Sequence, residues 1–265
     1  EHAGEVGRGA GGHWWDCKAI CGSGKIVGNL LASPPMARQP TDRTPEAADA
    51  GGSRDNFVQR SRTGDYRSDQ DLAGRLPDDI LEMYECRQWK HAGAILSTDF
   101  QRELADIVQV LRAVRLRRSF ITDPGGGKSK YAKAIDLAFR DLGWRPKRFN
   151  TAIVIDEYRV ESPTHEVDCF KNRIALEVEW SNKDPFYDRD LNNFRLLFDL
   201  RTISVGVVVT KSDELAGLMD ELGVWRKYGT TTTWMSKLLP RVLGGGGGGC
   251  PLLVFGIRRA VYTEE

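Results

Sequence analysis

Four acidic side chains fall in two neighbouring segments that both have the residue pattern of a β-strand. Over Ile174 to Trp180, apolar residues alternate with Glu177 and Glu179, so a strand places both carboxylates on one face. Glu166 and Asp168 share a face of the preceding segment, and the short polar turn between the two segments predicts an antiparallel pair. We therefore expect three or four carboxylates to converge on one spot.

Carboxylates gathered in this way indicate a site for a hard divalent cation. Their mutual repulsion raises their pKa values unless a cation lies among them. Mg²⁺ takes oxygen ligands, usually carboxylates together with water and substrate phosphate, and such sites support in-line attack of water on a phosphodiester. The alternative is that Glu177 and Glu179 lie on the solvated face of an edge strand, where the same alternation is common.

The polar segment that follows the acidic strand favours the cation site over a plain sheet edge. Residues 181–195, which include Lys183, are rich in side chains that contact phosphates and base edges of nucleic acids. A second segment, Trp225 to Trp234, interleaves basic, aromatic and hydroxyl groups, among them Lys227 and Thr231. This second segment suits DNA contact and a polar loop held by two core tryptophans equally well.

The elements that must position these residues follow from apolar periodicity, and they predict an α/β fold. Their order is α-β-β-β-α-β, which we expect to build a mixed β-sheet flanked by helices. The long apolar run near the end of this order fits a strand that is buried on both faces. The expected elements are a helix over 129–142, strands over 150–158, 165–170 and 174–180, a helix capped by Asp188 or Asp190, and a strand over 203–210.

Further elements are expected on both sides of this core. A first helix begins at Pro77, and its apolar stripe runs through Tyr84 to Trp89. A second helix follows Thr98, which is spaced to form a capping box with Gln101. The remaining expected elements are a helix capped by Ser212 that ends near Leu222 and a last strand over 252–257.

The first 75 residues differ from the rest of the chain in composition and in hydrophobic pattern. Residues 1–75 are rich in glycine and carry no apolar run with the period of a helix or a strand. Such a stretch cannot bury enough surface to offset its chain entropy. We expect these residues to be disordered or to be an extension outside the native fold, and we expect one folded domain over residues 76–265.

Composition excludes several classes of protein. The net charge of +1 leaves only local patches for an acidic partner. No stretch of about 18 apolar residues is present to span a membrane, and the N-terminus lacks the pattern of a secretory leader. Five scattered cysteines fit neither a zinc site nor a disulfide framework. We expect a soluble, cytoplasmic protein with reduced thiols.

The acidic segments resemble a known family of nucleases. Residues 166–180 and 182–195 are similar to the type II restriction endonucleases of the BglII and BamHI group, within the PD-(D/E)xK nuclease superfamily. That family's metal motif is an Asp, a gap of eight residues, and then Glu-x-Glu or Glu-x-Gln, which Asp168, Glu177 and Glu179 match here. The superfamily normally has Lys at the last position, so Glu179 could bind a second metal, orient the attacking water or accept its proton.

The resemblance implies an activity, a cofactor and partners. It implies a Mg²⁺-dependent, site-specific deoxyribonuclease that hydrolyses double-stranded DNA in restriction–modification, with the endonuclease domain over residues 76–265. Asp168 and Glu177 would hold one or two Mg²⁺ ions per active site, and Asn182 would lie in a DNA-contacting loop. Cleavage of both strands favours a homodimer that matches a palindromic site, and a partner DNA methyltransferase would act on the same site.

Two other functions fit parts of the sequence. The same fold could bind DNA without cutting it. Alternatively, Gly-Lys128-Ser129 before a helix is similar to a phosphate loop of a nucleotide hydrolase. The first Gly of that motif is replaced by Thr122, so we expect a helix-capping loop that touches the DNA backbone. For His165, close to the acidic strands, we expect a structural role.

Overall fold

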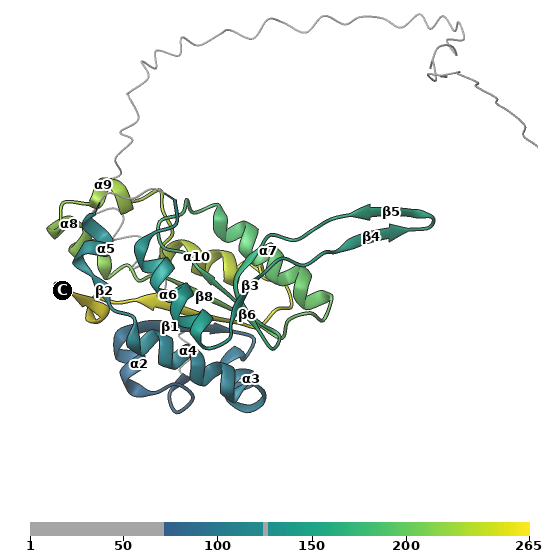
Figure 1. Ribbon diagram of the computed structural model, residues 1–265, viewed down its shortest axis with the longest axis horizontal. Coiled ribbons are helices and arrows are strands. Elements are labelled where there is room, and N and C mark those ends of the chain that lie inside the picture. The colour runs from purple at the N-terminus through teal and green to yellow at the C-terminus, as the bar shows by residue number, and fades with distance from the viewer. Residues whose placement is uncertain (1–71, 124–126) are drawn as a thin grey trace, which may run out of the picture. The chain divides into compact units, whose positions relative to one another are not determined.

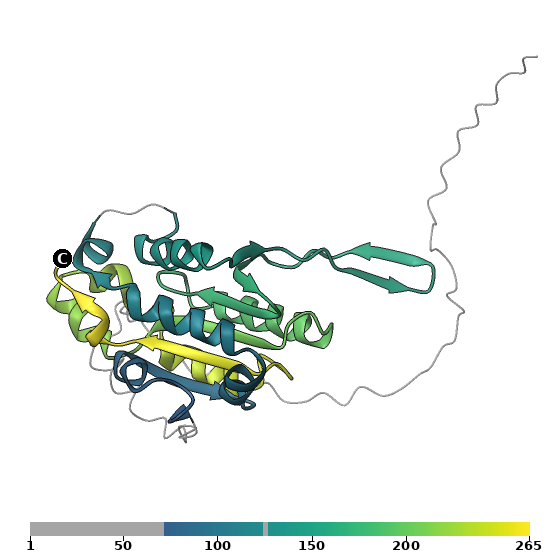
Figure 2. The same ribbon diagram turned by 60° about the horizontal axis from the view of Figure 1, so that its bottom comes forward.

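A six-stranded mixed sheet forms the centre of the fold, with helices on both of its faces (Figures 1 and 2). The computed structural model describes residues 72–123 and 127–265. The strand order is β1-β9-β8-β7-β6-β3. The strands are Tyr84–Trp89 (β1), Arg145–Lys147 (β3), Val167–Lys171 (β6), Ile174–Val178 (β7), Val205–Lys211 (β8) and Leu252–Ile257 (β9).

Two apolar cores lie on opposite faces of this sheet. The larger core packs α2, α3, α4, α6 and α8 against one face, and the smaller core packs α7 and α10 against the other. The helices are Asp78–Met83 (α2), Ala92–Asp99 (α3), Gln101–Ala113 (α4), Arg118–Thr122 (α5), Lys130–Asp141 (α6), Phe186–Asp199 (α7), Leu215–Glu221 (α8), Trp225–Tyr228 (α9) and Met235–Leu243 (α10), with a 3-10 turn at Arg259–Val261 (η2).

The expected mixed sheet and its α-β-β-β-α-β order are confirmed. Within the six-stranded sheet the order from α6 onward is α6, β3, β6, β7, α7 and β8. Strands β7, β8 and β9 are parallel, and β6 is antiparallel to β7. The turn between β6 and β7 has two residues with positive φ, Asn172 and Arg173, which is the backbone of a tight hairpin turn.

One strand of that order is a different segment from the expected one. The apolar run over 150–158 forms a separate hairpin of Ala152–Ile155 (β4) and Tyr158–Glu161 (β5), which stands away from the sheet in Figure 1. Its side chains at Ile155 and Tyr158 are 65% and 78% exposed. The edge of the sheet is β3 instead. Periodicity predicted extended chain here, but it missed the turn at residues 156–157 that makes a hairpin of the single expected strand, and it could not predict which partner the strand would pair with.

Two expectations near the start of the fold are wrong. Tyr84 and Trp89 lie in β1 and not in the first helix, because all six residues of β1 pair with β9. The Tyr84 hydroxyl also donates to the carbonyl of Leu111. The second helix, α4, has no capping box: Thr98 lies inside α3 and donates to the carbonyl of Ala94.

The described part of the chain begins a little before the expected domain. Leu72 is buried in the larger core, although the expected domain begins at residue 76. A short parallel pair, Leu116–Arg117 (β2) and Tyr262–Thr263 (β10), joins the chain near its C-terminal end to the middle of the domain. The prediction for residues 1–71 lies outside the described residues.

Among the residues described, none of the helices combines the length and the apolarity that crossing a membrane requires.

Close packing at the centre of the sheet depends on Gly206 of β8. A Cβ atom there would lie 2.7 Å from Phe194 of α7 and 2.8 Å from Leu252 of β9. We predict that Gly206→Ala lowers the free energy of unfolding by about 1–3 kcal/mol through overpacking. Urea unfolding measures this loss. Leu137→Ala, at a side chain 54% exposed on α6, is the control, and an unchanged midpoint for Gly206→Ala would contradict the prediction.

Candidate active site

Asp168 and Glu177 lie side by side where β6 runs antiparallel to β7. The backbone N–H of Asp168 donates to Oε2 of Glu177 at 3.3 Å. In the other direction, Oδ2 of Asp168 accepts from the backbone N–H of Val178 at 3.0 Å. Glu177 is 1% exposed, whereas Asp168 is partly exposed. The two strands therefore bring together the first two acidic residues of the predicted motif.

A cleft of about 270 Å³ opens over these carboxylates. We call it the acidic cleft. Glu166, which was expected on the same face, is exposed and does not line it. The residues that line it are Gly127, Lys128, Ser129, Ala132, His165, Asp168, Glu177, Val178, Glu179, Trp180, Ser181, Asn182 and Arg189.

Glu179 also faces the acidic cleft, held from two sides. The Asn182 side chain donates to Oε1 of Glu179 at 3.0 Å, and Nη2 of Arg189 lies 3.7 Å from the same oxygen. Strand β7 lies between β6 and β8, so Glu177 and Glu179 are not on a solvated edge. Their alternation has a different origin: Leu176 and Val178 face the larger core, while both glutamates face α7.

Asp190 of α7 belongs to the same cluster, which corrects its expected role as a helix cap. Helix α7 begins at Phe186 after Pro185, so Asp190 lies in its second turn and is 1% exposed. Its Oδ1 pairs with Nη2 of Arg189 at 2.7 Å. The carboxyl groups of Asp190 and Glu179 interact directly. Arg189 balances the charge of one of these two carboxyl groups, so the other carries a proton or a further cation lies beside them.

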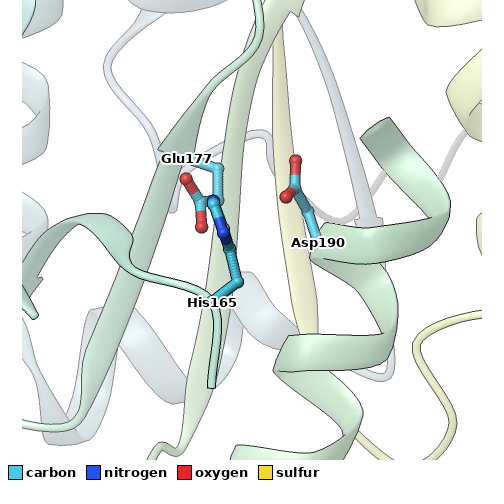
Figure 3. Close-up of side chains that lie close together, drawn as sticks. All are labelled: His165, Glu177 and Asp190. Carbon is cyan, nitrogen blue, oxygen red and sulfur yellow. The ribbon is translucent and has the colours of Figure 1, made fainter. Parts of the chain in front are cut away.

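His165 joins this cluster from the segment that precedes β6. His165, Glu177 and Asp190 each offer one ligand atom, and these three atoms lie within 4.8 Å of one another. Figure 3 shows the Glu177 carboxylate beside the His165 ring, with Asp190 approaching from α7. The expected structural role of His165 does not account for this position among ligand atoms.

Burial and mutual repulsion raise the pKa values of the clustered carboxyl groups. Burial is the largest cause of the raised pKa of Glu177, and Asp190 and Asp168 raise it further. Burial and then Asp190 raise the pKa of Glu179 to about 9. The pKa of Asp190 is also raised by burial, although Arg189 opposes the shift. Without a cation, these groups hold protons that ordinary carboxylates release.

Lys128 enters the acidic cleft and joins two carboxylates. Its Nζ lies 2.7 Å from Oδ1 of Asp168 and 2.6 Å from Oδ2 of Asp136, a residue of α6. Burial alone would lower the pKa of Lys128, but Asp168 and Asp136 outweigh it and raise that pKa. The neighbouring Ser129 caps α6, since its Oγ accepts from the backbone N–H of Ala132. The phosphate-loop-like segment is thus a helix cap whose lysine pairs with acidic groups.

A second cleft of about 330 Å³ adjoins the first and shares Gly127, Lys128, Ser129 and Ser181 with it. We call it the lysine cleft, because its other lining residues include three more lysines. Its lining is completed by Phe120, Asp123, Lys130, Lys133, Lys227 and Tyr228. A cleft lined by four lysines therefore adjoins the acidic groups.

The four residues expected to contact DNA separate into three places. Asn182 lines the acidic cleft, and Lys227 lines the lysine cleft, where its Nζ donates to the carbonyls of Ile121 and Asp123. Lys183 and Thr231 line neither cleft; they contact each other, since Nζ of Lys183 donates to the Thr231 hydroxyl at 3.1 Å.

Sequence reasoning missed Asp190, Arg189 and Asp136 as site residues. For Asp190 a signal exists: with Phe194 and Leu197 it falls on one face of a helix, at a spacing of four and then three residues. A carboxylate on a face that is otherwise apolar has to find a partner in the core. For Asp136 no comparable signal exists, because only the folded chain brings α6 against β6.

Comparison with known proteins agrees with this geometry. The model of the family described as restriction endonuclease BglII/BglIII matches residues 84–257. This match spans more than half of the chain, from β1 to β9, and includes every acidic residue of the cleft. No curated protein matches the chain. The chain therefore belongs to the BglII/BglIII restriction endonuclease family, which makes it an endodeoxyribonuclease of the type II restriction class that acts on DNA.

Proposed function

We propose that this chain hydrolyses phosphodiester bonds of both strands of DNA at a specific sequence, in a reaction that requires Mg²⁺. One observation carries the proposal. Glu177 lies beside Asp168 in a cleft open to solvent, and Oε1 of its buried carboxylate accepts no hydrogen bond from the described residues. A buried carboxylate oxygen without a donor is stabilised by a cation, which family membership also favours.

The donor set around Asp168 and Glu177 fits Mg²⁺. Asp168 and Glu177 supply carboxylate oxygens from adjacent strands, and Asp136 faces them across Lys128. Mg²⁺ prefers such oxygen ligands and usually keeps several waters. We assign Asp168 and Glu177 as the residues that hold the ion. When bound, a divalent ion polarises the phosphate and lowers the pKa of water.

We assign proton transfer to Glu179. Burial and Asp190 raise its pKa to about 9, so Glu179 holds a proton in the metal-free site. A cation bound nearby would release that proton, and the resulting carboxylate could accept a proton from water. Asn182 fixes one oxygen of Glu179 at 3.0 Å and holds the carboxylate at the cleft. Glu179 could bind a second metal, orient the attacking water or accept its proton. The last two roles fit this geometry better than the first.

The lysine cleft is our proposed path for the DNA backbone. Lys128, Lys130, Lys133 and Lys227 line it, and it meets the acidic cleft at Lys128. Lysines place phosphates without reading sequence, so this path would deliver the scissile phosphate to the carboxylates. Asn182 lines the acidic cleft, and Lys183, the next residue in the chain, contacts Thr231. We assign all three to DNA contacts.

The proposal includes two protein partners, a second copy of this chain and a DNA methyltransferase. One active site per chain cuts one strand at a time, so cleavage of both strands at a palindromic site favours a two-fold homodimer. A DNA methyltransferase that modifies the same site would protect the cell's own DNA, and both enzymes would act in the cytoplasm. A chain that binds DNA without cutting it is the outcome to be distinguished by experiment.

We predict that Asp168→Asn and Glu177→Gln each abolish Mg²⁺-dependent linearisation of plasmid DNA, because each removes a carboxylate that holds the ion. Calorimetry with Ca²⁺ should show weakened cation binding in both variants, while their gel retardation of DNA persists. Glu166→Gln, which changes an exposed carboxylate nearby, should cut as the wild type does. Unchanged cleavage by either variant would overturn the assignment, and a wild type that binds but never cuts would favour the non-cleaving alternative.

A second prediction concerns the stability of the chain in a chelator. An unfolded glutamate is ionised above about pH 4.5, whereas folded Glu179 keeps its proton up to about pH 9. The folded state therefore binds more protons across this window. The stability from this group is complete below pH 4.5 and is lost as the pH rises through 9, by up to about 1.4 kcal/mol per pH unit.

Urea unfolding in EDTA at a series of pH values measures this loss. Glu179→Gln should flatten the decline, because the amide does not titrate. Glu166→Gln, at an exposed position, should leave the decline as it is in the wild type. A wild-type stability that rises between pH 6 and pH 9 would contradict the prediction.

A third prediction tests the DNA path. Lys133→Ala together with Lys227→Ala should weaken DNA binding in Ca²⁺, and should reduce the dependence of log K on log salt by about 0.9 for each phosphate that a lysine no longer neutralises. Arg102→Ala removes an exposed positive charge on α4, outside both clefts. This control should keep the wild-type slope. Fluorescence anisotropy over a range of salt concentrations measures both, and an unchanged slope in the double variant would exclude this path.

A further inference from the structure

The cluster of His165, Glu177 and Asp190 lies beside the position assigned to Mg²⁺ but is distinct from it. Asp168 takes no part in it, because its Oδ1 pairs with Lys128 and its Oδ2 accepts from the N–H of Val178. Glu177 is the residue the two positions share. Its Oε2 lies toward Asp168, which leaves Oε1 for the cluster.

Two oxygens of this cluster are buried and have no donor among the N–H and hydroxyl groups of the described residues. They are Oε1 of Glu177 and Oδ2 of Asp190, and each residue is 1% exposed. Arg189 pairs with the other oxygen of Asp190, so the guanidinium does not reach the free one. With Glu179 in contact, three carboxyl groups meet a single guanidinium. Ionised, they carry two negative charges that Arg189 does not balance, and one dication would balance them.

The fold already holds the three side chains in place for a common ion. The three ligand atoms lie within 4.8 Å of one another, so a shift of less than about 1 Å in each brings them to metal–ligand distances of about 2.0–2.2 Å. Asn193, one turn after Asp190 on α7, donates to the backbone carbonyl of His165. Outer contacts of this kind orient metal ligands. His165 itself is exposed, which gives an ion a way in from solvent.

We propose that His165, Glu177 and Asp190 form a second cation position, which takes a transition-metal dication of the Co²⁺ or Zn²⁺ class. The imidazole decides the class, because nitrogen ligands suit these ions, whereas Mg²⁺ and Ca²⁺ prefer oxygen alone. The inference rests on the proposed function only in that Glu177 serves both positions. An ion here neutralises the buried carboxylates behind the Mg²⁺ ligands and holds Glu177 in position for them.

Titration of the full chain with Co²⁺ alone tests the proposal, with calorimetry for affinity and visible absorption for the ligand environment. His165→Gln should weaken one Co²⁺ binding event by more than roughly tenfold, since even outer contacts of metal ligands are worth about 10- to 100-fold. It should also remove the absorption change that an imidazole ligand produces. His165 is exposed, so this variant should fold, and its circular dichroism checks that it does.

Asp190→Asn is the second variant, and it should weaken the same event while relieving repulsion in the buried cluster. Glu166→Gln, a neighbouring carboxylate that is exposed, should bind Co²⁺ as the wild type does. Wild-type Co²⁺ binding in His165→Gln, or an imidazole signature that survives in it, would overturn the proposal. So would a loss of the same size in Glu166→Gln.

Asp168→Asn separates this inference from the proposed function. This variant should lose Mg²⁺-dependent cleavage yet keep the imidazole signature of Co²⁺, because Asp168 is not part of the cluster. If the wild type fails to cut DNA while the Co²⁺ signature depends on His165, the proposed function fails and the cation position stands. If Asp168→Asn loses the signature and His165→Gln keeps it, the cation position fails.

Discussion

The burial of three carboxyl groups at one point between β7 and α7 is the constraint on which the site depends. Glu177, Glu179 and Asp190 are each 1% exposed, and burial raises the pKa of every one of them. Such groups are stable only when they are protonated, paired with positive side chains or bound to a cation. Protonation, cation binding and the stability of the sheet are therefore coupled at the same place.

The positive side chains lie on two sides of this acidic cluster, and none of those named here reaches the Glu177 carboxylate between them. Lys128 joins Asp168 to Asp136 on one side, and Arg189 pairs with Asp190 on the other. Between them, Oε1 of Glu177 has no donor among the described residues. Lys128 also lines the lysine cleft, so a phosphate arriving there would compete with Asp168 and Asp136 for its charge. Binding of DNA and release of Asp168 for a cation would then favour each other.

The sheet explains how such a cluster can exist without disrupting the fold. Strand β7 is an interior strand, and its apolar face carries Leu176 and Val178 into the larger core. The opposite face begins with Ala175 in the smaller core and continues into the two glutamates where the acidic cleft opens. One strand thus contributes to both cores along part of its length and to the site at its end, as is common at the ends of strands in α/β folds.

The sequence alone determined the features that depend on local periodicity. The two-residue period of β7 predicted that Glu177 and Glu179 share a face, the tight turn predicted that Asp168 lies beside Glu177, and the apolar run over 203–210 predicted a buried strand. Each depends on neighbouring residues or on one short turn, so local chemistry is enough.

Only the tertiary structure decided which residues far apart in the sequence meet at the site. Asp190 was expected to cap α7, but α7 packs its second turn against β7. Lys128 was expected in a helix-capping loop, and only the folded chain brings it to Asp168. The single strand expected over 150–158 is instead part of a hairpin, in which β4 pairs with β5 outside the main sheet. These outcomes depend on contacts between segments far apart in the chain, and such contacts have no period that a local pattern can reveal.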